Sequence, residues 1–224
     1  MRVLAIDSST DILSVAVASG DGRAEASLDL GLRHAERIMG LVDFCLRLAG
    51  LERRDLELIA CARGPGSFTG LRIGMAASKG IAAGLGLPWV AVPTLDALAW
   101  GYEAFQGAVV PLIDGKKGRV YSAVYLRGER ATGWLDLPLA ELAALLDTYP
   151  DVLFTGPDAQ LAAGLAAERS GFAIDRRARA PAARGLAELA VESFERDGST
   201  PLGEGPLYLR PSEAEESSPE GARA

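Results

Sequence analysis

The chain has 224 residues, of which 49% are hydrophobic and 24% are charged, with a formal net charge of −7. This acidic balance argues against a large nucleic-acid footprint, which needs a basic face. The sequence has no run of 18 apolar residues, and its first apolar run is too short for a signal peptide. We therefore expect no membrane span and a cytoplasmic location, which two cysteines without disulfide-like spacing also fit. The single histidine, His34, excludes a histidine-pair metal site.

The first half of the chain predicts three strands followed by alternating helices and strands. An Asp-Gly pair at 21–22 is typical of a hairpin turn between the second and third strands. The expected strands lie at 3–7, 12–18, 23–30, 57–62 and 89–92, and the expected helices at 33–49, 71–85 and 94–105.

The second half repeats this order without repeating the sequence. The expected strands lie at 109–114, 120–126, 131–135, 152–155 and 172–174, and the helices at 139–147, 157–168 and 184–196. Three antiparallel strands followed by alternating elements imply a mixed sheet with helices on its faces. Because it occurs twice, this order resembles the duplicated α/β fold of the actin/hexokinase/Hsp70 superfamily. We expect an N-terminal actin-like lobe over 1–103 and a C-terminal lobe over 104–210. An acidic tail at 211–224 lacks large apolar residues and is expected to be disordered.

The most informative motif is RGPGSFTGLRIG at 63–74, which joins a predicted strand to a predicted helix. A glycine-rich turn at a helix N-terminus offers backbone N–H groups and the positive end of the helix dipole to an anion. The motif has Leu71 where a P-loop has lysine, and its glycines are spaced GxGxxxG rather than GxGxxG. Two interpretations stay open: a tight turn that packs helix on strand, or an anion site. The residues of the possible site are Arg63, Gly64, Gly66, Ser67, Thr69 and Arg72.

Two aspartate turns are further candidates. Asp7 ends the first strand and is followed by Ser9 in a hydroxyl-rich turn, and Asp114 ends the corresponding strand of the second half. They are typical positions for the phosphate turns of this superfamily, in vestigial form. The alternative for Asp7 is a turn aspartate that caps its own backbone.

The helix at 33–49 has an apolar arc of roughly 180°, wider than the roughly 100° of a surface helix. It is either set deeply in its own core or carries two stripes. One stripe (Ile38, Leu41, Cys45, Leu48) would pack on the sheet, and the other (Ala35, Met39, Val42, Leu46) would meet a partner helix.

The next helix has small residues in two rows, Gly70, Gly74 and Ser78 in one and Ala76, Gly80 and Gly84 in the other. Each interior glycine costs a helix about 1 kcal/mol relative to alanine. Close approach of a neighbour can offset that cost, and two rows suggest two neighbours, one of them another chain. The expected partner interface is Ala35, Met39, Val42, Leu46, Gly70, Gly74 and Ser78.

These motifs together resemble the TsaB (YeaZ) family. AIDSST at 5–10, RHAER at 33–37, RGPGSFTGLRIG at 63–74, GLGLPWVAVPTLDALA at 84–99, IDGKKGRVYSAVY at 113–125 and PLYLR at 206–210 follow the family's order. The resemblance implies a role in making threonylcarbamoyladenosine beside the anticodon of tRNAs that read codons starting with A. The family member is a non-catalytic partner of TsaD, a longer paralogue of the same glycoprotease-like fold, and the ATPase TsaE joins them. Contact with tRNA is expected only through the complex, and a homodimer is possible without TsaD.

Departures from the catalytic paralogue support the partner role. TsaD binds a metal with His-x-x-x-His on the helix that corresponds to 33–49, whereas here Ile38 stands four residues after His34. We therefore expect no metal and no catalytic residue in this chain.

The turn at 7–10 has serine where ATPases of the superfamily have glycine, and Arg119 replaces an acid in the turn that often reads DARRGEVY. We expect no cofactor of its own, with ATP or ADP and Mg²⁺ possible at the interface with the partner. The alternative is a self-sufficient ATP-dependent kinase or acyl transferase that holds Mg²⁺ with Asp7 and Asp114. A metallopeptidase is disfavoured by the single histidine.

Overall fold

The computed structural model describes residues 1–210 except 21, 30, 32, 178 and 180, so the predicted tail at 211–224 lies outside the described residues. The first lobe has a five-stranded sheet in the order β3-β2-β1-β4-β5. Its elements are β1 (Val3–Asp7), β2 (Ile12–Ala18), β3 (Arg23–Asp29), α1 (His34–Leu48), β4 (Leu58–Gly64), α2 (Phe68–Leu85), β5 (Trp89–Pro93) and α3 (Thr94–Ala99). Strands β1 to β3 pair antiparallel, and β4 and β5 continue the sheet in parallel.

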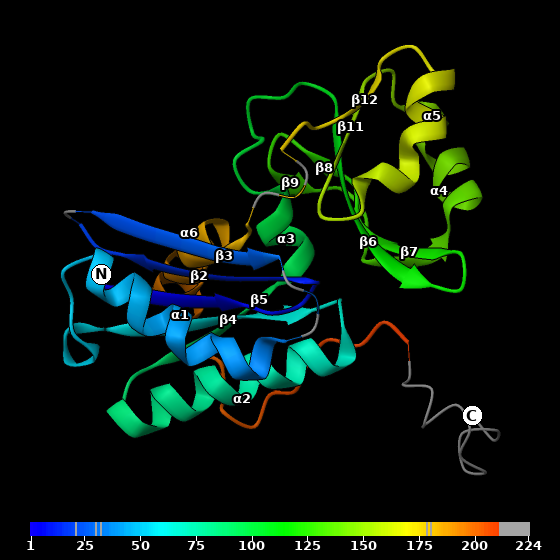
Figure 1. The fold of residues 1–224 in the computed structure, drawn as a ribbon. Coiled ribbons are helices and arrows are strands. Elements are labelled where there is room, and N and C mark those ends of the chain that lie inside the picture. The colour runs from blue at the N-terminus through cyan, green and yellow to red at the C-terminus, as the bar shows by residue number, and fades with distance from the viewer. Residues whose placement is uncertain (21, 30, 32, 178, 180, 211–224) are drawn as a thin grey trace, which may run out of the picture.

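The second lobe has a sheet whose main path is β10-β7-β6-β11-β12. Its elements are β6 (Ala108–Lys116), β7 (Arg119–Ser122), β8 (Tyr125–Leu126), β9 (Glu129–Arg130), β10 (Leu135–Pro138), α4 (Leu139–Leu145), β11 (Val152–Thr155), α5 (Ala163–Glu168) and β12 (Phe172–Ile174). The central strand β6 pairs antiparallel with β7 and parallel with β11, as β1 does with β2 and β4 in the first lobe. The predicted duplicated actin-like fold is confirmed (Figure 1).

The last helix, α6 (Ala183–Asp197), returns to the first lobe and contacts β1, β2 and β5. Helices α3 and α6 cover one face of the first sheet, and α1 and α2 cover the other. Helix α6 lies within residues 104–210, the range expected for the C-terminal lobe. Its apolar face is nevertheless buried against the sheet of the first lobe. No helix among the described residues is long and apolar enough to cross a membrane.

Four predicted elements differ from the structure. The helix expected over 94–105 ends at Ala99, because Trp100 takes an extended backbone conformation with ψ 139°. The strand expected at 120–126 divides into β7 and β8, and the strand expected at 131–135 is displaced to β10 by the short β8–β9 hairpin. The helix expected over 157–168 is a 3₁₀ turn at 159–162 followed by the short α5.

Candidate functional site

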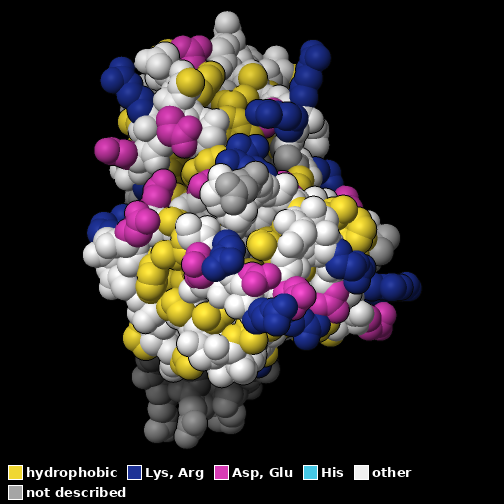
Figure 2. Space-filling model, turned by 90° about the vertical axis from the view of Figure 1, so that its left-hand side faces the viewer, with side chains coloured by type: hydrophobic (Ala, Val, Ile, Leu, Met, Phe, Trp, Pro, Cys, Tyr) yellow, Lys and Arg dark blue, Asp and Glu magenta, His cyan; other side chains and the backbone are white. Residues whose placement is uncertain are grey.

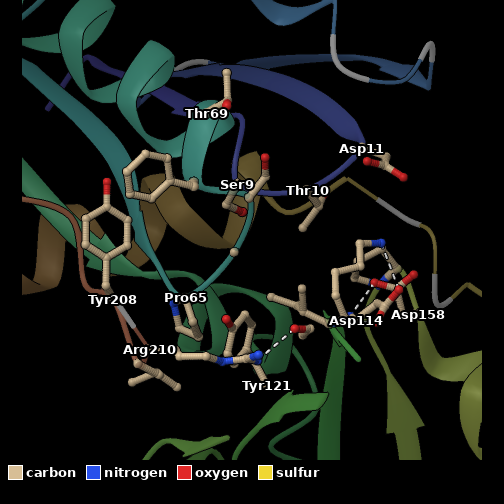
Figure 3. A pocket seen from close by; sticks show the side chains of 18 of the residues that line it. Ser9, Thr10, Asp11, Pro65, Thr69, Asp114, Tyr121, Asp158, Tyr208 and Arg210 are labelled. Carbon is tan, nitrogen blue, oxygen red and sulfur yellow. Dashed lines mark hydrogen bonds and ion pairs between the residues drawn. The ribbon is translucent and has the colours of Figure 1, made fainter. Parts of the chain in front are cut away.

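A cavity of about 920 Å³ lies between the two lobes (Figure 3). The first lobe lines it with the turn after β1 and with the start of α2. The second lobe lines it with the β6–β7 hairpin, and the segment 207–210 closes one side. The cavity thus brings together Ser9, Gly66, Ser67, Thr69, Arg72 and Asp114 of the predicted site residues. Asp7, Arg63 and Gly64 do not line it.

The glycines of the 63–74 motif pack α2 onto the turn after β1. A Cβ atom on Gly66 would lie 2.2 Å from the Ser9 carbonyl oxygen, and one on Gly70 would lie 2.1 Å from the Ser8 carbonyl oxygen. The Ser67 amide donates to the Ser9 carbonyl at 2.6 Å, and the Ser67 hydroxyl caps the helix by accepting from the Gly70 amide at 3.2 Å. This spacing therefore fits the tight-turn interpretation of the motif, since close packing already requires these glycines.

The two arginines of the motif have partners inside the chain. Arg63 pairs with Glu204 at 2.5 Å, and neither residue belongs to the cavity lining. Arg72 stacks over the Phe68 ring at 3.9 Å and donates to the Tyr208 hydroxyl at 3.1 Å. Of the predicted anion-site residues, Thr69 and Arg72 are exposed among the residues that line the cavity.

The two aspartate turns differ in their exposure. Asp7 is buried, and its Oδ1 accepts from the Ser9 amide at 2.9 Å and from the Ser9 hydroxyl at 2.6 Å. Burial raises the pKa of Asp7 above its ordinary value. Asp7 therefore caps its own turn, as the capping interpretation predicts.

Asp114 faces the cavity, where the Lys116 ammonium lies 2.8 Å from its Oδ2. Asp114 also receives the Lys116 amide at Oδ1, also at 2.8 Å, while its own amide donates to Asp158. A Mg²⁺ held jointly with Asp7 does not fit this arrangement. Asp7 is outside the cavity lining, and an ammonium already neutralises Asp114.

The structure corrects the predicted partner interface. Val42 and Leu46 are buried in the core between α1, α2 and the sheet, at 1% and 4% exposure. Gly70, Gly74 and Ser78 are also buried against their own chain. A Cβ on Gly74 would meet the Ser8 hydroxyl, and the Ser78 hydroxyl accepts from the Trp89 indole. The wide apolar arc of α1 is explained by burial against two neighbours, the sheet and α2.

Two of the predicted interface residues on α1, and a second row of small residues on α2, are exposed to solvent. Ala35 and Met39 are exposed as predicted, whereas Leu48, expected on the sheet, is 60% exposed. The second small-residue row of α2, with Ala76, Gly80 and Gly84, is exposed as well, and a Cβ on either glycine would meet nothing within 4 Å. We name Ala35, Met39, Ala76, Gly80 and Gly84 the outer helix face. Phe44 and Leu48 are also exposed, but they lie on the opposite side of α1, nine residues after Ala35 and Met39 respectively.

The two duplicated lobes with a cavity between them define a protein of the actin-like fold. The model of the family described as TsaD, tRNA N6-adenosine threonylcarbamoyltransferase, matches residues 30–163. The chain is 31% identical to the TsaB protein of Bacillus subtilis over 96% of both chains, and 42% identical to that of Escherichia coli over 58% of this chain and 57% of that protein. The structure of YeaZ from Pseudomonas aeruginosa has a TM-score of 0.79 at 29% identity, covering 93% of this chain and 99% of that one. The chain belongs to the TsaB (YeaZ) family.

Sequence reasoning missed the segment 200–210, although PLYLR at 206–210 was recognised as a motif. In the structure Tyr208 stacks on Phe68, and Arg210 reaches the second lobe. An aromatic and a basic residue just before a polar tail were the available indication that this segment is anchored.

Proposed function

We propose that this chain is a non-catalytic partner that binds and activates a TsaD transferase in threonylcarbamoyladenosine synthesis. The observation that carries the proposal is the outer helix face, where Met39 of α1 and the small residues of α2 are exposed. Exposed apolar side chains gathered on adjacent elements are typical of a protein–protein interface. The relatives' name, tRNA threonylcarbamoyladenosine biosynthesis protein, supplies the pathway.

The contacts of His34 support a non-catalytic role. This side chain is buried, and its Nε2 lies 2.7 Å from the Thr10 carbonyl oxygen, so it ties the start of α1 to the turn after β1. Ile38, one helical turn later, is a core residue. The helix position that would hold a metal in TsaD is therefore used here for packing.

The small residues of α2 suit a helix of the partner. Without side chains at Gly80 and Gly84, a second helix can approach the α2 backbone closely and recover the cost of two interior glycines. We infer a bundle of α1 and α2 with the corresponding helices of TsaD. In its absence, the same face would pair with a second copy as a symmetric homodimer.

Any nucleotide is proposed for the assembled complex. Thr69 and Arg72 in the cavity lining would contribute a hydroxyl and a guanidinium to ATP or ADP, and the partner would supply the remaining ligands and any Mg²⁺. The ATPase TsaE is proposed as a third member. On the face drawn in Figure 2, basic and acidic side chains are interspersed, so this face presents no continuous basic patch of the kind that binds nucleic acid. Contact with tRNA is proposed only through the complex.

Reconstitution tests the proposal against the kinase or acyl transferase alternative. The chain and its TsaD paralogue are assayed separately and together for threonylcarbamoyladenosine formed on tRNA from the threonylcarbamoyl donor. We expect modification that depends on both proteins and none by this chain alone. Steady ATP turnover by the isolated chain that is lost in Asp7→Asn would instead establish the alternative.

A further inference from the structure

The segment 200–210, which we name the C-terminal strap, leaves α6 and runs along the first lobe toward the second (Figure 1). Hydrogen bonds at several positions along the strap fasten it to the first lobe. The Thr200 amide donates to the Trp89 carbonyl at 2.8 Å, the Lys79 ammonium to the Glu204 carbonyl at 2.5 Å, and the Leu207 amide to the Arg63 carbonyl at 2.8 Å.

The end of β4 is shaped to receive the strap. Gly64 has a left-handed φ of +115°, and a Cβ there would lie 2.5 Å from the Leu207 carbonyl oxygen. One residue further along, Tyr208 stacks on Phe68 with ring centroids 4.9 Å apart, and its hydroxyl accepts from Arg72. The strap is therefore anchored at the N-terminal end of α2 before it crosses to the second lobe.

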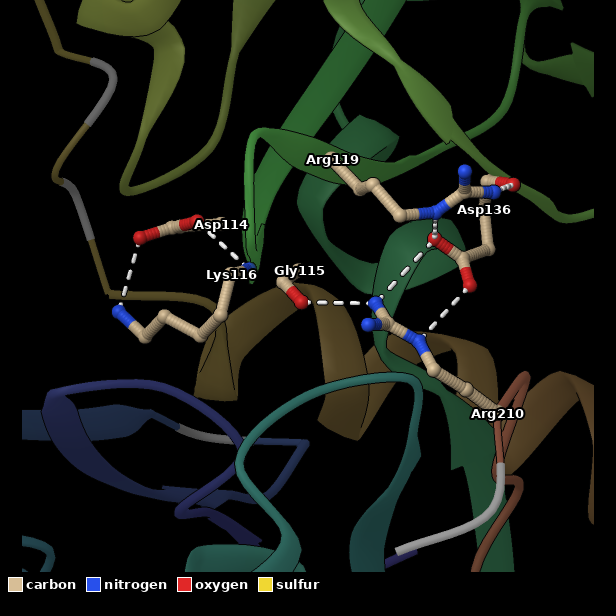
Figure 4. Close-up of polar contacts among 6 residues, drawn as sticks. All are labelled: Asp114, Gly115, Lys116, Arg119, Asp136 and Arg210. Atoms are coloured by element: carbon tan, nitrogen blue, oxygen red, sulfur yellow. Dashed lines mark hydrogen bonds and ion pairs between the residues drawn. The ribbon is translucent and has the colours of Figure 1, made fainter. Parts of the chain in front are cut away.

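Arg210 makes the crossing (Figure 4). Its Nη2 donates to the Gly115 carbonyl at 2.8 Å, and its Nε lies 3.2 Å from Oδ2 of Asp136. Asp136 also accepts from Nε of Arg119 at 2.8 Å. The side chains of Asp136 and Arg210 are only 14% and 20% exposed, so water and salt screen this pair less than a surface ion pair.

The lobes also meet at α3, none of whose residues lines the cavity. There α3 of the first lobe shares a hydrophobic core with β6 and Tyr125 of the second, and the Tyr125 hydroxyl donates to Asp96 of α3. Arg210, in contrast, lines the cavity. The shared core at α3 is the contact about which the lobes can rotate, which makes it a hinge. The Arg210–Asp136 ion pair at the cavity wall is the contact that holds the lobes together, which makes it a latch.

We propose that Arg210 is a latch that holds the two lobes at their present separation, and that its release lets the cavity open. The strap stays fastened to the first lobe by its own contacts, so breaking the Arg210 contacts removes a polar link between the lobes at the cavity wall without undocking the strap. Arg179, which also lines the cavity, makes a further link, to Asp29 of β3 at 2.7 Å and to the Pro157 carbonyl at 3.2 Å. The Arg210 latch is independent of any partner.

The latch is tested by the distance between the lobes in the full chain. Spin labels are placed on Arg54→Cys in the first lobe, where the native side chain is 78% exposed, and on Glu168→Cys in the exposed end of α5. The native Cys45 and Cys61 are buried, and burial raises their pKa values to about 11 and about 12, so they resist labelling at neutral pH. Double electron–electron resonance then reports the distribution of interlobe distances.

The informative variant is Arg210→Met, which keeps an unbranched side chain and removes the guanidinium. Arg196→Met is the matched control, because Arg196 lies on α6 with a 70% exposed side chain and pairs only locally, with Asp197. We expect the distance distribution to widen at least twofold in Arg210→Met and to stay unchanged in Arg196→Met. An unchanged distribution in Arg210→Met would overturn the proposal, as would equal widening in both variants.

Circular dichroism checks that each variant is folded. If Arg210→Met does not fold, Arg210→Lys is measured in its place, because an ammonium keeps the charge but lacks the fork that reaches both Gly115 and Asp136. A widened distribution in Arg210→Lys then supports the latch, and an unchanged one refutes it.

Discussion

Substitution of Gly70 by alanine tests why α2 contains glycines. If glycine is needed for close packing against the turn after β1, the added Cβ should destabilise the chain. The added Cβ would lie 2.1 Å from the Ser8 carbonyl oxygen, whereas real contacts of this kind are not closer than 3.0 Å. The oxygen cannot rotate away, because it is backbone directly after β1, whose residue Asp7 is paired with Ser14 of β2. Either α2 or the turn must move.

Overpacking of this kind costs about 1–3 kcal/mol. The gain in helix propensity from glycine to alanine is small so close to the N-terminus of α2, so most of that cost should remain. For a chain of this size, each kcal/mol shifts the melting temperature by about 2–4 °C. We therefore expect Gly70→Ala to melt several degrees below the unmodified chain.

Gly80→Ala is the matched control on the same helix. Nothing lies within 4 Å of a Cβ at Gly80, so only the propensity gain of about 1 kcal/mol applies, and the melting temperature should rise by about 2–4 °C. Thermal unfolding followed by circular dichroism gives both values. A Gly70→Ala chain that melts at or above the unmodified chain would refute the packing argument.

Three further outcomes are expected. Asp7→Asn should stabilise the chain at pH 8. Burial raises the pKa of Asp7 above 3.8, so the folded chain loses stability as the pH rises through the folded-state pKa and the buried carboxyl group ionises. Asparagine does not ionise and avoids this loss. The gain should vanish near pH 3, where Asp7 is protonated in both states; a gain that is constant across pH would contradict this origin. A chain that ends at Ser212 should keep its melting temperature, since residues 213–224 include no large apolar side chain that could anchor them, and a fall of several degrees would show that the tail is docked. Cys45 and Cys61, buried and with raised pKa values, should stay unreactive toward a thiol reagent at pH 8 until the chain unfolds, and rapid reaction of the folded chain would contradict their burial.

The mixed sheets and the order of elements along the first lobe could be predicted from the sequence, because alternation, turn residues and the repeated element order all indicate the same kind of sheet. The role of each face of α2 could not be predicted from the sequence. Two rows of small residues have the same periodicity, and only the position of the turn after β1 decides that Gly70 and Gly74 are buried while Gly80 and Gly84 are open. Periodicity predicts that a helix has two close neighbours, not which neighbour belongs to the same chain.

The roles of the predicted site residues could not be predicted either, because they depend on contacts that the sequence pattern does not show. The role of Asp7 depends on the Ser9 hydroxyl and amide that it accepts, and the role of Arg63 depends on Glu204, which lies 141 residues later in the chain. Contacts this distant leave no local pattern. The strap escaped prediction for the same reason, since its partners Phe68, Gly115 and Asp136 are scattered along the chain.

The most direct test of the partner role is the affinity of this chain for its TsaD paralogue, measured by isothermal titration with three proteins. These are the unmodified chain, Met39→Asp on the outer helix face, and Leu161→Asp as a control in the second lobe. Met39 is 39% exposed and Leu161 46%, so both variants should fold. Burying an unpaired carboxylate in the interface costs several kcal/mol, so Met39→Asp should weaken binding by about a hundredfold or more while Leu161→Asp binds as the unmodified chain does. Equal binding by the folded Met39→Asp chain, or equal weakening by both variants, would contradict the account.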